Sequence, residues 1–533
     1  MHHEHKPLKI SDIRDFVPKK LKPWILFVFV VIFQLSGGVY LASVSEMTGS
    51  LALMQEDIMM AGYASLVGLS LVFTVMFRFK FAVTTKTALL ITATGLILCN
   101  VAVVFTHSVP VLVGVSLIAG FLRMWGTFAG NTVIQLWITP KRDMSVWFVY
   151  IYLLVQGAMQ LSGIFTIYTA FLSKWEYMHW LIVGLLLLVV LFTLILFKRF
   201  RFMKRLPLFG IDWTGMVLWA TTILSFIFVL NYGEHYDWFE SVYIRAGLVM
   251  ALSSLALNLW RASFIRHPFI DLNTWKIRNV WLTFLLYILV DLLLSPAHLL
   301  EHIYTETILG YDSLHLASLN WVIIAGTLCG AFIGYQLFAK RKWSYKKMTL
   351  IGFSFIASYL LIMYFNIDYN LPKQILALPL FLRGAGYVII ATTFITALTG
   401  IDFKVFPQTL TIQAFISACL GALLGSTILQ HFFKIVLKKN FTFLSSGFDS
   451  VNHQLKQIPQ GKLFESLQQQ AIMVSMKELY GWLTILSIAS LLAFFLKESS
   501  LRPTALHPKF KTIRKSIKHQ LKMDKLNRYF SAS

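Results

Sequence analysis

Apolar runs of about 20 residues recur along the whole chain, and short polar or basic segments separate them. The first run begins at Trp24 and the last ends near Leu496. A helix needs about 20 apolar residues to cross the hydrocarbon core of a bilayer. Because backbone polar groups in lipid must find partners within their own segment, each run is predicted to be helical. The pattern therefore predicts an all-α membrane protein with about fourteen transmembrane helices.

The predicted spans are even in number, which places both chain termini on one side of the membrane. Their residue ranges are 24–42, 58–77, 87–106, 109–130, 145–170, 179–197, 211–230, 242–264, 280–303, 316–338, 348–366, 374–398, 408–432 and 478–496. The first run has the length of a full span, and many more follow it. We therefore interpret it as a retained helix rather than as a cleaved signal.

Lys and Arg residues lie mainly in alternate loops, whereas acidic residues occupy the opposite loops. The basic segments are 19–22, 78–80, 141–142, 198–205, 261–266, 340–347 and 509–528. Loops rich in Lys and Arg stay on the cytoplasmic side of a membrane. Both termini are therefore predicted to be cytoplasmic, and the Gln-rich segment 433–477 is predicted to be the longest external loop.

The composition agrees with a membrane protein and argues against two other classes. Hydrophobic residues make up 57% of the 533 residues and charged residues only 13%, compared with about 25% charged residues in a soluble domain. The formal net charge of +23 does not indicate nucleic-acid binding, because the basic residues form short scattered clusters and no single basic face. The three cysteines, Cys99, Cys329 and Cys419, lie in apolar spans, so neither a metal site nor a disulfide framework is expected.

The spans group into two halves of six helices with two further helices between them. We predict a cytoplasmic tail at 1–23, a first half at 24–197, two central helices within 198–264, a second half at 265–496 and a basic cytoplasmic tail at 497–533. The tripeptide Phe121–Leu122–Arg123 in the fourth span recurs as Phe381–Leu382–Arg383 in the twelfth. Without the central pair these are the fourth helices of two halves, as in transporters built from parallel repeats.

Three stretches around the two central spans carry a resemblance to a known family. They are Asp212–Trp213–Thr214–Gly215 followed by Leu230–Asn231–Tyr232–Gly233–Glu234, then His267–Pro268–Phe269–Ile270–Asp271–Leu272, then Leu309–Gly310–Tyr311–Asp312–Ser313–Leu314. Their order and spacing resemble those of the fourteen-helix drug:proton antiporters of the Emr and Qac type, within the major facilitator superfamily. The layout of the chain resembles that family over nearly its whole length.

The resemblance implies a major facilitator fold and a secondary transporter that exports amphiphilic small molecules in exchange for protons. It also implies a location in the bacterial inner membrane, no cofactor and, by analogy, partnership with a periplasmic adaptor and an outer-membrane channel. Two alternatives stay open, a transporter of one specific metabolite and a polytopic membrane enzyme or sensor. The sequence has no Gly-x-x-x-x-Gly-Lys-Ser/Thr phosphate loop, so an ion gradient rather than ATP is the expected energy source.

Ionisable residues inside spans are the first candidates for chemistry, because a charge at the bilayer centre costs about 2.5–3.5 kcal/mol on insertion scales. Asp291 lies about halfway through the ninth predicted span, shortly before Pro296. A carboxylate beside a helix bend either takes up and releases a proton or hydrogen-bonds a neighbouring helix. His298, Glu301 and His302 share one face of the same predicted helix, where they form either an outer proton relay or a wetted helix end.

Two arginines and four polar residues complete the candidate set. Arg123 and Arg383 lie well inside spans, where each either lines the central cavity beside a proton or substrate site or holds helices together through carbonyl groups. Four further residues, within spans or at their edges, either contact substrate or join neighbouring helices: Gln34, Asn131, Gln156 and Gln160. Two histidines and one carboxylate are too few ligands for a good metal site, so no metal is expected.

The predicted topology can be tested with reporter fusions. A reporter that is active only outside the cytoplasm should be inactive at Ser533 and active near Gly447, because the basic loops hold both termini inside. Equal activity at both positions would contradict the fourteen-span arrangement.

Overall fold

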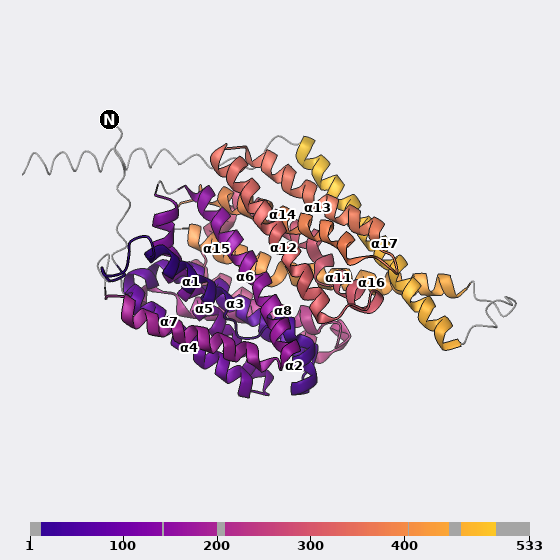
Figure 1. Cartoon of the computed structure of the whole chain (residues 1–533), viewed down its shortest axis with the longest axis horizontal. Coiled ribbons are helices and arrows are strands. Elements are labelled where there is room, and N and C mark those ends of the chain that lie inside the picture. Colours follow the sequence, from indigo (N-terminus) through magenta and orange to yellow (C-terminus); the bar gives the residue numbers. More distant parts are fainter. Residues whose placement is uncertain (1–11, 141–142, 200–207, 403–404, 447–459, 497–533) are drawn as a thin grey trace, which may run out of the picture.

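The chain folds into long helices arranged as two bundles that lie side by side (Figure 1). The architecture is that of a computed structural model, which describes residues 12–140, 143–199, 208–402, 405–446 and 460–496. The predicted tail at 497–533 and the first eleven residues lie outside the described residues. Within those ranges the only strand-like pairing is an isolated bridge between Ile13 and Phe197, which ties the segment before the first helix to the end of α7.

The first bundle contains six long helices and one short helix. Their bounds are α1 (Lys22–Leu35), α2 (Val44–Leu51), α3 (Gln55–Ala82), α4 (Thr85–Phe105), α5 (Val109–Ile138), α6 (Met144–Leu172) and α7 (Glu176–Leu196). Helix α3 packs against α5, α4 packs against both α5 and α7, and α1 packs against α5 and α6.

The second bundle repeats this packing with different residues. Its helices are α10 (Arg278–Leu294), α11 (Leu300–His302), α12 (Ser313–Ile333), α13 (Tyr345–Asn366), α14 (Lys373–Leu398), α15 (Phe406–Ala414), α16 (Ala422–Ser445) and α17 (Gln460–Leu496). Helix α12 packs against α14, α13 packs against α14 and α17, and α10 packs against α16. Counted from the start of each bundle, these are the same helix pairs, so the repeat indicated by the two Phe-Leu-Arg motifs is present in the fold.

The predicted spans correspond one to one with helices of the structure. Thirteen helices in the described part of the chain are long and apolar enough to cross a bilayer. Helix α1 is also apolar but has only 14 residues. The predicted all-α fold is therefore confirmed, and the chain is a multi-pass membrane protein.

Glycines allow the backbones of α3 and α5 to touch in the first bundle, and those of α12 and α14 in the second. A Cβ atom on Gly120 of α5 would lie 1.8 Å from the carbonyl oxygen of Ser65 on α3. In the second bundle, a Cβ atom on Gly326 of α12 would lie 2.2 Å from the carbonyl oxygen of Phe381 on α14. A Cβ atom on Gly330 would lie 2.5 Å from the carbonyl oxygen of Ala385 on the same helix. Such close backbone approach is typical of helix pairs in membranes, where small residues replace the hydrophobic driving force.

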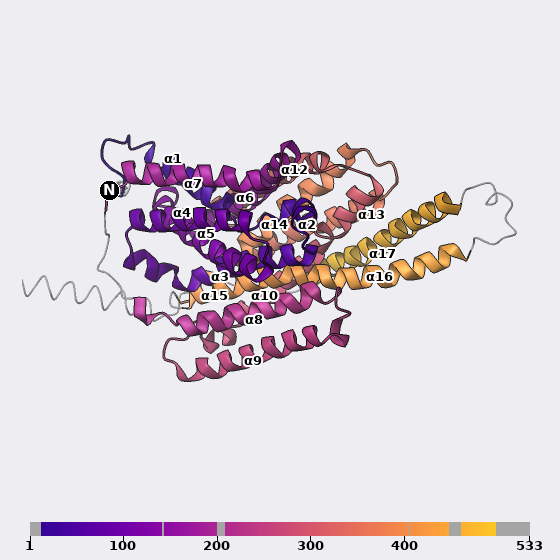
Figure 2. The same cartoon turned by 90° about the horizontal axis from the view of Figure 1, so that it is seen from below.

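The two central helices lie along one side of the paired bundles (Figure 2). Helix α8 (Trp213–Tyr232) packs against α3, α9 and α16, and α9 (Val242–Phe264) is the outermost helix. The ring of Trp219 on α8 stacks on that of Phe415, with centroids 6.1 Å apart. Helix α8 therefore covers the seam between the bundles, whereas α9 mainly faces lipid.

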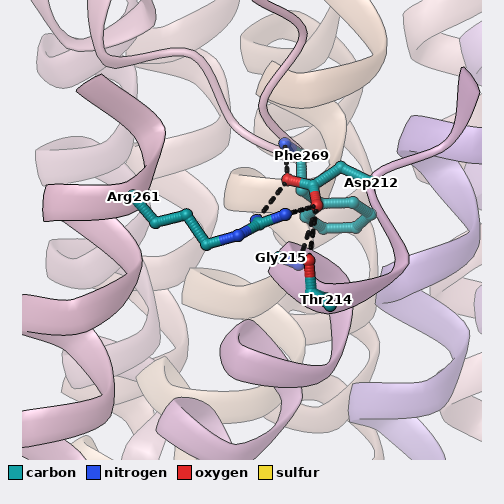
Figure 3. A network of polar contacts seen from close by, with 5 residues as sticks. All are labelled: Asp212, Thr214, Gly215, Arg261 and Phe269. Atoms are coloured by element: carbon teal, nitrogen blue, oxygen red, sulfur yellow. Dashed lines mark hydrogen bonds and ion pairs between the residues drawn. The ribbon is translucent and has the colours of Figure 1, made fainter. Parts of the chain in front are cut away.

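A carboxylate at the start of α8 holds the central pair together (Figure 3). Asp212 accepts two hydrogen bonds from Arg261 of α9, at 2.9 and 2.6 Å, and one each from the backbone N–H groups of Gly215 and Phe269. Burial would raise the pKa of Asp212, but these hydrogen bonds outweigh it and hold the pKa below its usual range. The clamp therefore contributes stability above the ordinary aspartate pKa and loses it as the pH falls.

The segment 433–477, which the sequence indicated as a loop, is largely helical where the structure describes it. Helices α15 and α16 run as one 40-residue segment to Ser445, about 60 Å long and roughly twice the hydrocarbon thickness. Helix α17 begins at Gln460 and returns beside it (Figure 2). Asn440 donates a hydrogen bond to Ser475, at 3.0 Å, across the pair. Hydropathy detects only the membrane-embedded part of such helices, which is why their polar extensions resembled a loop.

The glycine contacts predict a difference between two substitutions on one helix. Gly120→Ala should destabilise the protein by about 1–3 kcal/mol, because the added methyl group overpacks the α3–α5 contact. Gly114→Ala on the same helix meets open space and should be neutral or slightly stabilising, since alanine is the better helix former. Thermal unfolding of both purified variants, followed by tryptophan fluorescence, measures the difference. Equal melting temperatures would contradict the close backbone contact.

Candidate functional site

The first helix of the first bundle stops inside the membrane. Helix α1 ends at Leu35, only about 21 Å from its start, although the apolar run continues to Ala42. The intervening residues include Gly37 and Gly38, and the Gly37 N–H donates a hydrogen bond to the Tyr40 hydroxyl at 3.2 Å. Non-helical backbone at this depth is tolerated where protein buries it or where it lines a cavity.

The first helix of the second bundle is interrupted at the corresponding place. Helix α10 ends at Leu294, a 3₁₀ turn spans Ser295–Ala297, and a π-helical turn at Ile303–Ile308 follows α11. Pro296 explains the break, because it cannot donate the helical hydrogen bond. Interrupted helices in corresponding positions of two repeats are the best structural indicator of a transport site.

Beside the first break, Arg123 of α5 contacts the end of α1. Its Nη2 donates a hydrogen bond to Oε1 of Gln34 at 3.2 Å. The Gln34 amide nitrogen in turn donates to the Thr127 hydroxyl at 3.0 Å. The Nε atom of Arg123 is fully buried and has no hydrogen-bond partner among the described residues.

Three more polar side chains extend this network across the first bundle. The Tyr40 hydroxyl donates to Oδ1 of Asn100 on α4 at 3.2 Å. Nδ1 of His179 on α7 lies 3.0 Å from the same oxygen. The rings of Tyr40 and His179 have centroids 4.9 Å apart. The network thus joins the first, third, fourth and sixth helices of the bundle, and all of its described members are formally neutral except Arg123.

Beside the second break, Arg383 of α14 forms an ion pair with Glu301 of α11. Only 13% and 14% of these two side chains are exposed. The hydroxyl of Tyr359 on α13 donates to Oε1 of Glu301 at 2.6 Å, and the guanidinium lies 5.9 Å from the centre of the Tyr359 ring. Tyr480 of α17 lies within electrostatic range of the pair. These are again the first, third, fourth and sixth helices, but here the arginine has a carboxylate partner.

Glu301 and Arg383 line a cavity of about 200 Å³. Other polar groups on its wall are His302, Thr305 and Asn320. Leu316, Leu319, Ile323, Met363, Leu376 and Leu380 supply its apolar wall. At about 30 Å³ for each water, this space holds roughly six or seven waters. The sequence left open whether Glu301 belongs to an outer proton relay or to a wetted helix end, and the structure places its side chain, 14% exposed, at this cavity.

Asp291 lies in the same interrupted helix but in different surroundings. Its side chain is buried, and its Oδ2 atom has no hydrogen-bond partner in the described part of the chain. A Cβ atom on Gly421 would lie 2.1 Å from that oxygen, so the carboxyl group is wedged against the π-helical turn between α15 and α16. It does not line the cavity that contains Glu301.

The remaining candidates divide between the network and the scaffold. His298 lies within electrostatic range of Glu301 and Arg383, and His302 pairs with Glu306 at 2.9 Å. The helix was expected to be continuous, with His298, Glu301 and His302 on one face, but the break at Ser295–Ala297 interrupts that regular spacing.

Asn131 accepts a hydrogen bond from Tyr150 at 3.2 Å, which joins α5 to α6. Two residues of α6 are partly exposed and make no hydrogen bond to another described residue: Gln156 and Gln160.

Several polar contacts join the bundles near the ends that carry the basic loops. Thr74 of α3 and Thr411 of α15 have hydroxyl groups 2.7 Å apart. Asp143, at the start of α6, forms an ion pair with Lys342, in the loop after α12. Burial would raise the pKa of Asp143, but hydrogen bonds from Lys342 and Ser145 outweigh it and lower the pKa. The pair therefore remains charged at neutral pH and joins the two bundles at this end.

The comparisons with known proteins agree with this architecture. No family model matches the sequence, and no curated protein matches it. Solved structures do match: nucleoside transporter NupG at 13% identity and a TM-score of 0.50, covering 90% of this chain and all of that one. Tetrameric PepTSo2 matches at 13% identity and a TM-score of 0.51, and the match covers 90% of this chain and 98% of that one. An auto inhibited POT family peptide transporter matches at 12% identity and a TM-score of 0.50, and the match covers 92% of this chain and 99% of that one.

The chain has the major facilitator fold. At 12–13% identity, these matches show the arrangement of the helices and do not identify a substrate. The sequence indicated the two arginines, Gln34, Glu301 and His298 as candidates but did not indicate their neighbours Tyr40, Asn100, His179 and Tyr359. Their only signal was that they are polar residues within apolar spans, which many scaffold residues share.

The ion pair predicts a large thermodynamic coupling between Glu301 and Arg383. Glu301→Gln leaves a buried guanidinium without its anion and should destabilise the protein by about 3–5 kcal/mol. Adding Arg383→Gln should cost much less than the sum of the single changes, because the double variant contains no unpaired charge. Glu306→Gln breaks a pair in which both side chains are exposed and should change stability by about 1 kcal/mol or less. Denaturant unfolding in mixed micelles measures all four, and additive single changes would contradict the pair.

Proposed function

We propose that this chain is a proton-coupled secondary transporter that works by alternating access between its two bundles. The observation that carries the proposal is the Glu301–Arg383 pair at the break in the second bundle. In the first bundle, Arg123 has the amide of Gln34 as its partner, so only the second of the two networks contains a carboxylate. Glu301 is therefore the proposed proton carrier, and Asp291, our first candidate from the sequence, becomes the second.

The surroundings of Glu301 explain how a proton would alter the site. Four groups face the carboxylate, Arg383, Tyr359, Tyr480 and His298. Protonation neutralises Glu301 and removes its attraction for the guanidinium, which leaves Arg383 buried without an anion. A conformation that gives Arg383 another partner or access to water is then favoured. A proton thus biases the equilibrium between two arrangements of the bundle.

The closed end of the molecule supports alternating access. The contacts of Thr74 with Thr411 and of Asp143 with Lys342 join the bundles near the predicted cytoplasmic face. The cavity at Glu301 lies in the opposite half of the membrane, about 11 Å before the end of the π-helical turn at Ile308. This state would admit protons from outside while the inner end stays closed.

The resemblance to drug:proton antiporters supports export of amphiphilic molecules from a bacterial inner membrane. In a double-membraned bacterium, a periplasmic adaptor and an outer-membrane channel would be the partners. The second candidate is transport of one small metabolite. It is favoured by the small volume of the cavity, about 200 Å³, because pockets for drug-sized ligands are usually about 300–1,000 Å³.

Replacement of the proposed proton carrier should separate pumping from exchange. Glu301→Gln keeps the shape of the side chain but fixes the neutral state. In liposomes with an imposed pH gradient, this variant should lose at least about 90% of uphill transport and keep downhill exchange of the same substrate. Asp291→Asn should keep most uphill transport, because the carboxyl group of Asp291 faces packed backbone rather than the cavity.

Comparison of Glu301→Gln with Asp291→Asn decides which carboxylate carries the proton. Parental uphill transport by Glu301→Gln would exclude Glu301 as the proton carrier. Loss of uphill transport in Asp291→Asn alone would move the coupling role to Asp291.

A further inference from the structure

We infer that Arg123 binds the anionic group of the transported molecule, so that the substrate is a singly charged organic anion. This inference rests on the proposed transport function. It assigns the two halves different ligands: the substrate anion beside the break in α1, and the proton beside the break in α10.

Arg123 carries an unbalanced charge. No carboxylate in the described part of the chain forms an ion pair with Arg123, and Tyr40 is the ionisable side chain within electrostatic range. The hydrogen bond from Arg123 to Gln34 is made to a neutral amide. The Nε atom of Arg123 makes no hydrogen bond to a described residue. A buried charge without a counterion costs several kcal/mol. A site that keeps such a charge has capacity for an anion.

The protein compensates Arg123 only in part. Helix α1 ends one residue after Gln34, and the carbonyl end of a helix carries roughly half a negative charge. That dipole and the Gln34 oxygen stabilise the guanidinium without neutralising it. One positive charge remains, which suits a monoanion such as a carboxylate. A dianion would leave an extra negative charge in the membrane.

The matching site in the second bundle shows what full compensation looks like. Arg383 occupies the same helix position and the same repeated tripeptide, yet Glu301 neutralises it. The two arginines therefore differ in the charge of the side chain that each contacts, a neutral amide in one bundle and a carboxylate in the other. If arginine at this position served packing alone, both halves would be expected to hold a neutral pair.

The surroundings of Arg123 offer further groups to a ligand. Its side chain as a whole is partly exposed, whereas its Nε atom is buried. Gly38 lies so close to α5 that a Cβ atom would be 2.6 Å from the Cα atom of Ser116. The Ser116 hydroxyl is buried and has no partner among the described residues, and it lies about two helical turns before Arg123.

Two amphiphilic probes of equal size and opposite charge test the inference on the full purified chain. The probes are 2-naphthoate and 2-naphthylmethylammonium, and isothermal titration measures their binding. We expect the parent to bind naphthoate at least tenfold more tightly than the ammonium compound. Arg123→Gln should weaken naphthoate binding at least tenfold. Arg245→Gln, which changes an exposed arginine on the outermost helix, should leave it unchanged.

Gln34→Glu provides a second variant that does not depend on losing the arginine. It places a carboxylate beside Arg123 and reproduces the pair of the second bundle. This internal anion should compete with naphthoate and weaken its binding at least tenfold, while the melting temperature stays equal or rises.

Three outcomes would overturn the inference: naphthoate binding that survives Arg123→Gln, preferential binding of the ammonium probe, or no naphthoate binding by a parent that pumps in liposomes. Binding of naphthoate through Arg123 by a protein without proton-driven transport would instead support the anion site and exclude the proposed function.

Discussion

A guanidinium group inside a bilayer needs a nearby negative charge or dipole, and the organisation of both bundles depends on this requirement. Arg383 meets it with a carboxylate from a neighbouring helix. Arg123 meets it with an amide oxygen and the carbonyl end of a short helix. The two arginines thus lie on equivalent helices of the two bundles and differ in the charge of their partner. That difference is the physical basis for assigning a proton to one half and an anion to the other.

The interrupted helices make this arrangement possible. A continuous helix satisfies its own backbone and offers a ligand only its side chains. Arg123 bonds Gln34, one residue before the end of α1, and Arg383 pairs with Glu301, which follows the break after Leu294. Backbone contact between the second and fourth helices holds both arginines in register, because glycine at Gly120 and Gly326 lets the chains touch.

Much of the fold could be predicted from the sequence, because a bilayer imposes the length and apolar character of every span. The charges inside spans were found for the same reason, since they are rare there. Their pairing could not be predicted. Hydropathy does not reveal that the break at Pro296 carries Glu301 into the bundle, or that Tyr359 and Arg383 meet it from other helices. It also missed the polar ends of α16 and α17, which pair outside the apolar region.

The claim that Glu301 is the proton carrier is tested most directly by infrared difference spectroscopy across a pH titration. The account predicts that acidification of the purified protein produces a carboxylic-acid C=O band that is absent in Glu301→Gln and retained in Asp291→Asn. A band that persists without Glu301 and disappears in Asp291→Asn would contradict the account.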